Sequence, residues 1–188
     1  MRLNRILKSQ GFGSVSECSK FIENGLVRVN GVLVKDPVSE IETQDAVFSL
    51  AEIDFTYREM AYIALHKPVG YECSHRPQFH PSVYSLLPYY LIKRGIQAVG
   101  RLDEDTSGLL LFSDDGQFIH RFTSPKKQII KTYRILLKYP VDEHLLRTLN
   151  EGVLLRGEKS AVHAKSCTQL NDQSLMIGIT EGKYHQVK

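Results

Sequence analysis

The sequence predicts an α+β protein with a small N-terminal unit of two helices and a hairpin, followed by a mixed, mainly antiparallel β-sheet with flanking helices. Three observations support this. Apolar residues recur at helical spacing near the N-terminus, an Asn-Gly pair then separates two alternating stretches, and short strand-like runs with brief spacers fill the remainder. We place the domain boundary near residue 58, which predicts domains 1–57 and 58–188.

The N-terminal unit begins with a predicted pair of helices. Residues 2–10 place three apolar side chains on one helical stripe beside basic ones, and glycines follow. Either Ser14 or Ser16 can cap a second helix, which ends at Asn24-Gly25, a pair that favours a left-handed cap. A helix-turn-helix-like pair is the expected result.

A tight hairpin follows the helix pair. Asn30-Gly31 lies between two alternating apolar stretches, which is the strongest short signal for a two-residue hairpin turn. Residues 46–50, AVFSL, predict a further strand, and residues 51–60 predict a connector.

The larger unit alternates strand-like runs with two predicted helices, at 115–123 and 141–150. The spacers are mostly too short for repeated crossover helices, which favours antiparallel pairing. The predicted strands are YIALHK, LLLFS, KTYRILLKY, VHAKSCTQL and SLMIGIT.

The composition favours a cytoplasmic protein. Three distant cysteines without a CxxC pair argue against a disulfide framework. We also find no signal peptide and no apolar segment near the roughly 20 residues that span a bilayer. The formal charge of +3 is compatible with a polyanionic partner but does not establish one.

Basic side chains concentrate near the N-terminus. Residues 1–35 hold six basic and two acidic side chains, whereas residues 36–56 hold six acidic and no basic ones. By charge alone, an ordinary solvated face and a phosphate-binding surface are both open. The candidate phosphate contacts are Arg2, Arg5, Lys8, Lys20, Arg28 and Lys35.

Residues 99–116, VGRLDEDTSGLLLFSDDG, form the most informative stretch, because a polar loop with three acids leads directly into an apolar strand. Loops held by rigid strands often carry catalytic groups. The residues alone favour a simpler interpretation, in which the three acids from Asp103 to Asp105 form a solvated turn and Arg101 pairs with one of them.

This stretch resembles the signature loop of the pseudouridine synthases, in which the Asp of the GRLD pattern is catalytic. Three further segments resemble family elements in the expected order: ALHKPVGYECS at 64–74, SPKKQIIKTYRI at 124–135 and EGKYHQVK at 181–188. The N-terminal unit is similar to the RNA-binding domain named after ribosomal protein S-four. The resemblance therefore covers essentially the whole chain.

The resemblance implies the site residues and the chemistry. Asp103 becomes the catalytic carboxylate, and Lys188 the cation that offsets its desolvation. Tyr133 can stack on the uracil, although an inward-facing strand Tyr is the alternative. Arg101 is the candidate to fill the space of a flipped-out base, with a salt bridge to the Asp103 loop as the alternative. No cofactor is implied.

Other chemistries find little support in the sequence. Four of the seven histidines, His66, His80, His120 and His185, invite a metal site, but no H-x-x-H or H-E-x-x-H pair exists and the cysteines are not spaced as ligands. No G-x-S-x-G elbow supports a Ser/His/Asp hydrolase. A glycosidase that uses Asp103 and Asp105 as paired carboxylates would hydrolyse the bond instead of rejoining it.

The resemblance also suggests a substrate. Residues 70–88, GYECSHRPQFHPSVYSLLP, favour enzymes acting on 16S rRNA, or on a small-subunit assembly intermediate, over those acting on 23S rRNA. A catalytically silent RNA-binding assembly factor is the rival from another class. The family's third block normally continues past this point, so we expect a catalytic domain truncated at its C-terminal end. A monomer without membrane contact is the default expectation.

Overall fold

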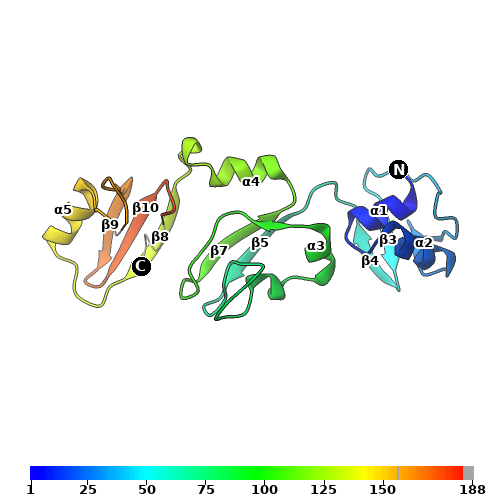
Figure 1. Ribbon diagram of the computed structural model, residues 1–188, viewed down its shortest axis with the longest axis horizontal. Coiled ribbons are helices and arrows are strands. Elements are labelled where there is room, and N and C mark those ends of the chain that lie inside the picture. The colour runs from blue at the N-terminus through cyan, green and yellow to red at the C-terminus, as the bar shows by residue number, and fades with distance from the viewer. Residues whose placement is uncertain (156, 184–188) are drawn as a thin grey trace. The chain divides into compact units, whose positions relative to one another are not determined.

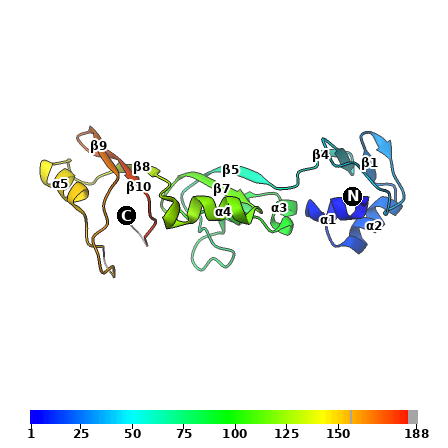
Figure 2. The same cartoon turned by 90° about the horizontal axis from the view of Figure 1, so that it is seen from above.

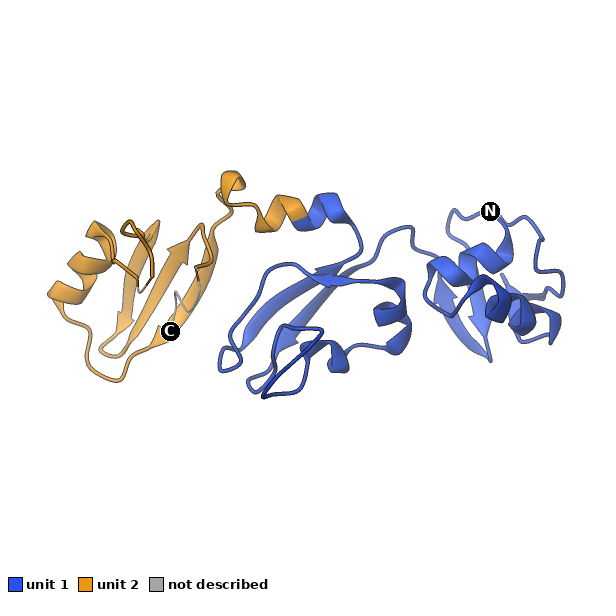
Figure 3. Cartoon of the chain, in the orientation of Figure 1, with its two compact units in different colours: residues 1–119 blue, residues 120–188 orange. Residues whose placement is uncertain are grey.

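A computed structural model describes residues 1–155 and 157–183. The chain divides into two compact units, Met1–Ile119 and His120–Lys188 (Figure 3). The elements are α-helices and antiparallel strands, so the predicted α+β class is confirmed (Figure 1). The domain boundary predicted near residue 58 falls inside the first unit and stays a prediction.

Two helices and a four-stranded sheet form the N-terminal part of the first unit. The sheet has the strand order β2-β1-β3-β4, and both helices cover one of its faces (Figure 2). Apolar side chains such as Leu3, Ile22 and Phe48 fill the space between helices and sheet. The elements are α1 Leu3–Ser9, α2 Val15–Glu23, β1 Val27–Val29, β2 Val32–Leu33, β3 Val47–Leu50 and β4 Ile53–Thr56.

Local sequence signals explain where these elements begin and end. Ser14 caps α2 in a capping box with Glu17, so the first of the two predicted serines is the cap. The helix runs to Glu23 with Asn24 as its C-cap and Gly25 at a positive φ of 72°, so it ends at the predicted Asn24-Gly25 pair. Asn30 and Gly31 both have positive φ, at 48° and 81°, as the hairpin turn between β1 and β2 requires.

The predicted connector at 51–60 is wrong in part, because it contains β4. This strand pairs with β3 across a turn at Ala51 and Glu52, whose φ angles are 51° and 68°. Turns with two positive φ values favour Asn and Gly, and neither is present here. The hairpin therefore gave no turn signal in the sequence.

The rest of the first unit is built on a second antiparallel sheet, with strand order β5-β7-β6. Buried side chains including Val83, Ile96 and Phe112 form its core. The short helix α3 was not predicted, because six residues are too few to show a helical period. The elements are β5 Tyr62–Lys67, η1 Val83–Leu86, α3 Tyr89–Arg94, β6 Gln97–Ala98 and β7 Gly108–Ser113. The helix α4, Gly116–Thr123, begins in the first unit and ends in the second (Figure 3).

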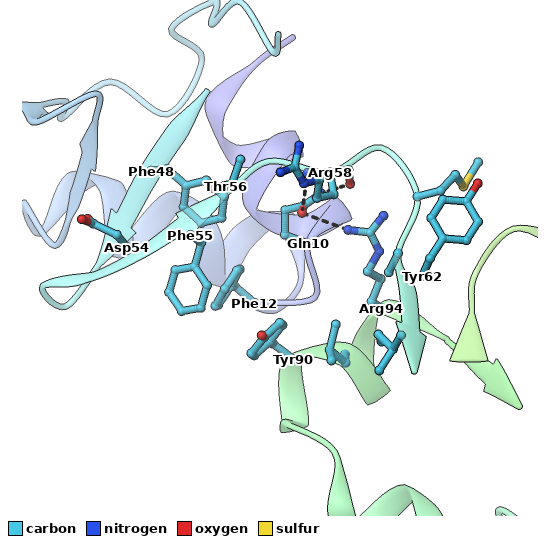
Figure 4. A pocket seen from close by; sticks show the side chains of 14 residues that line it. Gln10, Phe12, Phe48, Asp54, Phe55, Thr56, Arg58, Tyr62, Tyr90 and Arg94 are labelled. Atoms are coloured by element: carbon cyan, nitrogen blue, oxygen red, sulfur yellow. Dashed lines mark hydrogen bonds between the residues drawn. The ribbon is translucent and has the colours of Figure 1, made fainter. Parts of the chain in front are cut away.

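Arg94 on α3 connects the end of α1, the segment between β4 and β5, and the segment after β7. It pairs with Asp114, its guanidinium donates to Gln10 Oε1 at 2.9 Å, and it also donates to the Glu59 carbonyl at 2.5 Å. Nearby, the rings of Phe12 and Tyr90 stack with centroids 5.3 Å apart. Gln10, Phe12, Tyr90 and Arg94 are among the residues that line a pocket of about 470 Å³ (Figure 4).

Replacement of Arg94 by Met is expected to destabilise the protein by about 3 to 5 kcal/mol, because the carboxylate of Asp114 would lose its charged partner in a largely buried setting and, among the residues described, would keep only the Ala61 N–H. The two side chains are only 4% and 16% exposed. The matched control is Arg2→Met, since Arg2 and Glu40 form an exposed pair worth about 0 to 1 kcal/mol. Urea unfolding measures both; equal losses would contradict the prediction.

The second unit is a three-stranded antiparallel sheet with strand order β8-β10-β9, accompanied by α5. The central strand β10 is buried along most of its length. Both helices predicted for the larger part of the chain are present, as α4 and α5. The remaining elements are η2 Pro125–Lys127, β8 Lys131–Leu136, α5 Glu143–Glu151, β9 Ser166–Asn171 and β10 Ser174–Ile179.

Candidate active site

The loop that leads into β7 carries Asp103, whose side chain is half-buried. A β-turn shapes the loop: the amide N–H of Thr106 donates to the Asp103 carbonyl at 3.1 Å. The Gly70 N–H donates to the Glu104 carbonyl at 2.7 Å, which ties the turn to the segment after β5. Asp103 thus lies on a short loop fixed between two paired strands.

Lys67, the last residue of β5, anchors this loop through its side chain. Its side chain is fully buried. The ammonium donates to the carbonyls of Asp103, Glu104 and Thr106, at 2.9, 3.3 and 2.8 Å. It also donates to the Pro68 carbonyl at 3.1 Å. A single buried cation therefore holds the backbone on both sides of the turn.

Burial lowers the pKa of Lys67, and negative groups nearby, including the carboxylates of Glu104, Asp105 and Asp103, act in the opposite direction. The hydrogen bonds from its Nζ satisfy the buried charge with backbone oxygens. Lys67 is thus a cation at the Asp103 loop that interpretation of the sequence did not single out. The alternation of β5 places Lys67 on the same inward face as Ile63 and Leu65, but this pattern alone does not show the acceptors that the lysine meets.

The other predicted site residues lie in separate parts of the chain. Arg101 is exposed and precedes Asp103 in the first unit. Tyr133 lies on β8 of the second unit, half-buried and opposite Ile177 of β10. This position agrees with the alternative in which Tyr133 is an inward-facing strand residue. Lys188 lies outside the described residues.

The six basic residues predicted to contact phosphates are all exposed, as such contacts require. Arg5 and Lys8 lie on α1, Lys20 on α2 and Arg28 on β1. Arg2 immediately precedes α1, and Lys35 follows β2. Arg2 lies 3.8 Å from the Glu40 carboxylate, and Arg28 donates to the Gly31 carbonyl at 3.2 Å. Such exposed contacts are weak, so both side chains can rearrange toward a polyanion.

Residues 61–188 match the family described as RNA pseudouridylate synthase, and residues 1–47 match the S4 domain. The chain belongs to the RNA pseudouridylate synthase family. It is an RNA pseudouridine synthase with an N-terminal S4 domain, which confirms both resemblances that the sequence suggested.

Named relatives of this pseudouridine synthase span its whole length. The ribosomal small subunit pseudouridine synthase A of Haemophilus influenzae is 37% identical over 188 residues, which is 100% of this chain and 81% of the relative. The enzyme of the same name from Vibrio cholerae is 36% identical and is covered to 80%. An uncharacterized RNA pseudouridine synthase of Bacillus subtilis is 35% identical, with the same coverage.

A solved structure agrees with the family assignment. A crystal structure of pseudouridylate synthase superposes with a TM-score of 0.63 at 36% identity, covering 100% of this chain and 80% of that one. Within the residues described, the pseudouridine synthase has no helix that is long and apolar enough to cross a membrane. The same residues contain no group of three or more His, Cys, Asp or Glu side chains placed to hold a metal ion.

Proposed function

We propose that this pseudouridine synthase isomerises one uridine of 16S rRNA, on a small-subunit assembly intermediate or on the RNA alone, with Asp103 as its catalytic carboxylate. The reaction breaks the N-glycosidic bond, turns the uracil while it stays bound, and rejoins it through carbon 5. The names of the Haemophilus influenzae and Vibrio cholerae relatives support the small-subunit target.

The observation that carries the role of Asp103 is the construction of its loop. Lys67 and Gly70 fix the backbone of the turn, and β7 follows within a few residues. A half-buried carboxylate on a loop held in this way can attack the substrate covalently or assist departure of the base from the sugar. Either role needs a fixed position relative to the sugar.

Three further residues complete the proposed site. The ring of Tyr133 stacks on the uracil, and Lys188 offsets the charge of Asp103. Arg101 enters the RNA and fills the space that the flipped-out base leaves. The exposure of Arg101 supports this last role, because a residue that enters RNA has to reach beyond the protein surface.

The S4 domain positions the RNA through its six exposed basic side chains. Contacts with phosphates give affinity and orientation without sequence information, so the target uridine has to be selected elsewhere on the enzyme. We propose that the enzyme works in the cytoplasm as a monomer and uses no cofactor.

The decisive experiment is pseudouridine mapping on 16S rRNA transcripts, on small-subunit precursor particles and on 23S rRNA transcripts. A single new pseudouridine in 16S rRNA supports the proposal. Modification of 23S rRNA alone would move the target to the large subunit. Free uracil would indicate a glycosidase. Salt-dependent RNA binding without any modification would leave only an assembly factor.

A further inference from the structure

The loop between β5 and η1, residues 72–82, has the features of a second RNA-contacting element. Figure 2 shows it projecting from the sheet that contains β5 and β7. Its base is closed by two backbone hydrogen bonds, from the Glu72 N–H to the Pro81 carbonyl at 3.0 Å and from the Val83 N–H to the Glu72 carbonyl at 2.9 Å.

Glu72 also braces the far end of the loop from within. Its carboxylate accepts the backbone N–H groups of Gln78, Phe79 and His80, at 3.0, 2.8 and 2.8 Å. These backbone donors hold the pKa of the Glu72 carboxyl below its usual range. Ser82 Oγ donates to the Ser74 carbonyl at 2.6 Å and closes the loop further. The tip is therefore ordered before any ligand arrives.

The side chains at this braced tip point into solvent. Phe79 is 87% exposed, more than any other exposed large apolar residue described in the chain. Arg76 and His80 of the same loop are exposed as well. A single exposed apolar side chain is common on protein surfaces and decides nothing by itself. Here the ring stands on a loop braced by internal hydrogen bonds, which also carries an exposed cation and an exposed histidine.

The loop also adjoins the Asp103 loop. The Leu102 N–H donates to Cys73 Sγ at 3.5 Å, and the Gly70 N–H donates to the Glu104 carbonyl at 2.7 Å. The segments on either side of Asp103 are thus tied to the residues that open the braced loop. The base of the braced loop therefore lies directly beside the loop that carries Asp103.

We propose that Phe79 stacks on an unpaired nucleobase of the RNA substrate near the target uridine, while Arg76 contacts a neighbouring phosphate. Aromatic rings that receive unstacked bases, together with cations for the backbone, are the usual means of recognising single-stranded RNA. The inference rests on the proposed function, because it takes the RNA that occupies the Asp103 site as the ligand.

The test compares the wild type with Phe79→Ala and Phe79→Trp, measuring RNA dissociation constants and pseudouridine formation on small-subunit rRNA. Loss of one stacked base is expected to raise Kd and KM about 10-fold for Phe79→Ala, with kcat within about 2-fold of the wild type. Phe79→Trp should keep wild-type affinity. The matched control is Tyr89→Ala, which removes a ring that is 69% exposed on α3 and should change neither constant.

Unchanged Kd in Phe79→Ala would overturn the inference, and so would equal weakening in Phe79→Trp, which would point to loop structure instead of stacking. If Tyr89→Ala weakens RNA binding as much as Phe79→Ala, any exposed ring has the same effect, and the inference about Phe79 is overturned. The dissociation constants need no turnover. A wild type that forms no pseudouridine would therefore defeat the proposed function while the binding comparison still decided the role of Phe79.

Discussion

Replacement of Asp103 by Asn is expected to lower the rate of pseudouridine formation by about 10²- to 10⁴-fold or more, while RNA binding stays near that of the wild type. The amide has nearly the same shape as the carboxylate, so the turn closed by the Thr106 N–H can form unchanged. It carries no negative charge and is neither a nucleophile nor a base of useful strength. Single-turnover assays with excess enzyme measure the rate directly.

The matched control is Asp105→Asn, two residues further along the same turn. Asp105 is exposed, whereas Asp103 is half-buried, so the two substitutions remove the same charge from different settings. We expect Asp105→Asn to retain nearly full activity. If both variants lose activity equally, the loop acts through its total charge. If Asp103→Asn retains more than about a tenth of the wild-type rate, another group performs the chemistry.

The sequence was most informative where local chemistry decides the structure. A capping serine, an Asn-Gly turn and alternating apolar residues each act over a few neighbours, so α2, the β1–β2 hairpin and β5 were predictable. The strand β4 and the helix α3 were not, because one follows a turn without Gly or Asn and the other spans less than two helical turns. Tertiary packing determines both.

The residues of the candidate site also differ in how far the sequence predicted them. Asp103 was predictable because a long motif surrounds it, and family resemblance gave the motif its meaning. Lys67 was not predicted, since its hydrogen bonds join residues 36 to 39 positions apart. A lysine at an inward position of a strand indicates a buried cation only when the acceptors are known. Local pattern does not show which carbonyls another segment will bring to that end of the strand.

Replacement of Lys67 by Met is the second substitution expected to have a large effect. Met fills much of the same volume but donates no hydrogen bond, so several carbonyls of the Asp103 turn would be left without their buried donor. The expected loss is about 3 kcal/mol of unfolding free energy. The Thr106 and Pro68 carbonyls lose the lysine donor, at about 1 to 3 kcal/mol for each unsatisfied acceptor, whereas the Asp103 and Glu104 carbonyls keep backbone N–H donors. Urea unfolding gives this value, and the midpoint should fall.

Activity should fall as well, even at temperatures where the Lys67→Met variant remains folded, because the backbone that places Asp103 loses its anchor. A loss of activity in the folded variant would distinguish Lys67 from a residue that only stabilises the fold. Lys93→Met is the control, since Lys93 is exposed on α3, and it should change stability by about 0.5 kcal/mol or less. A folded Lys67→Met enzyme with wild-type kcat would show that the Asp103 turn keeps its catalytic position without the buried ammonium.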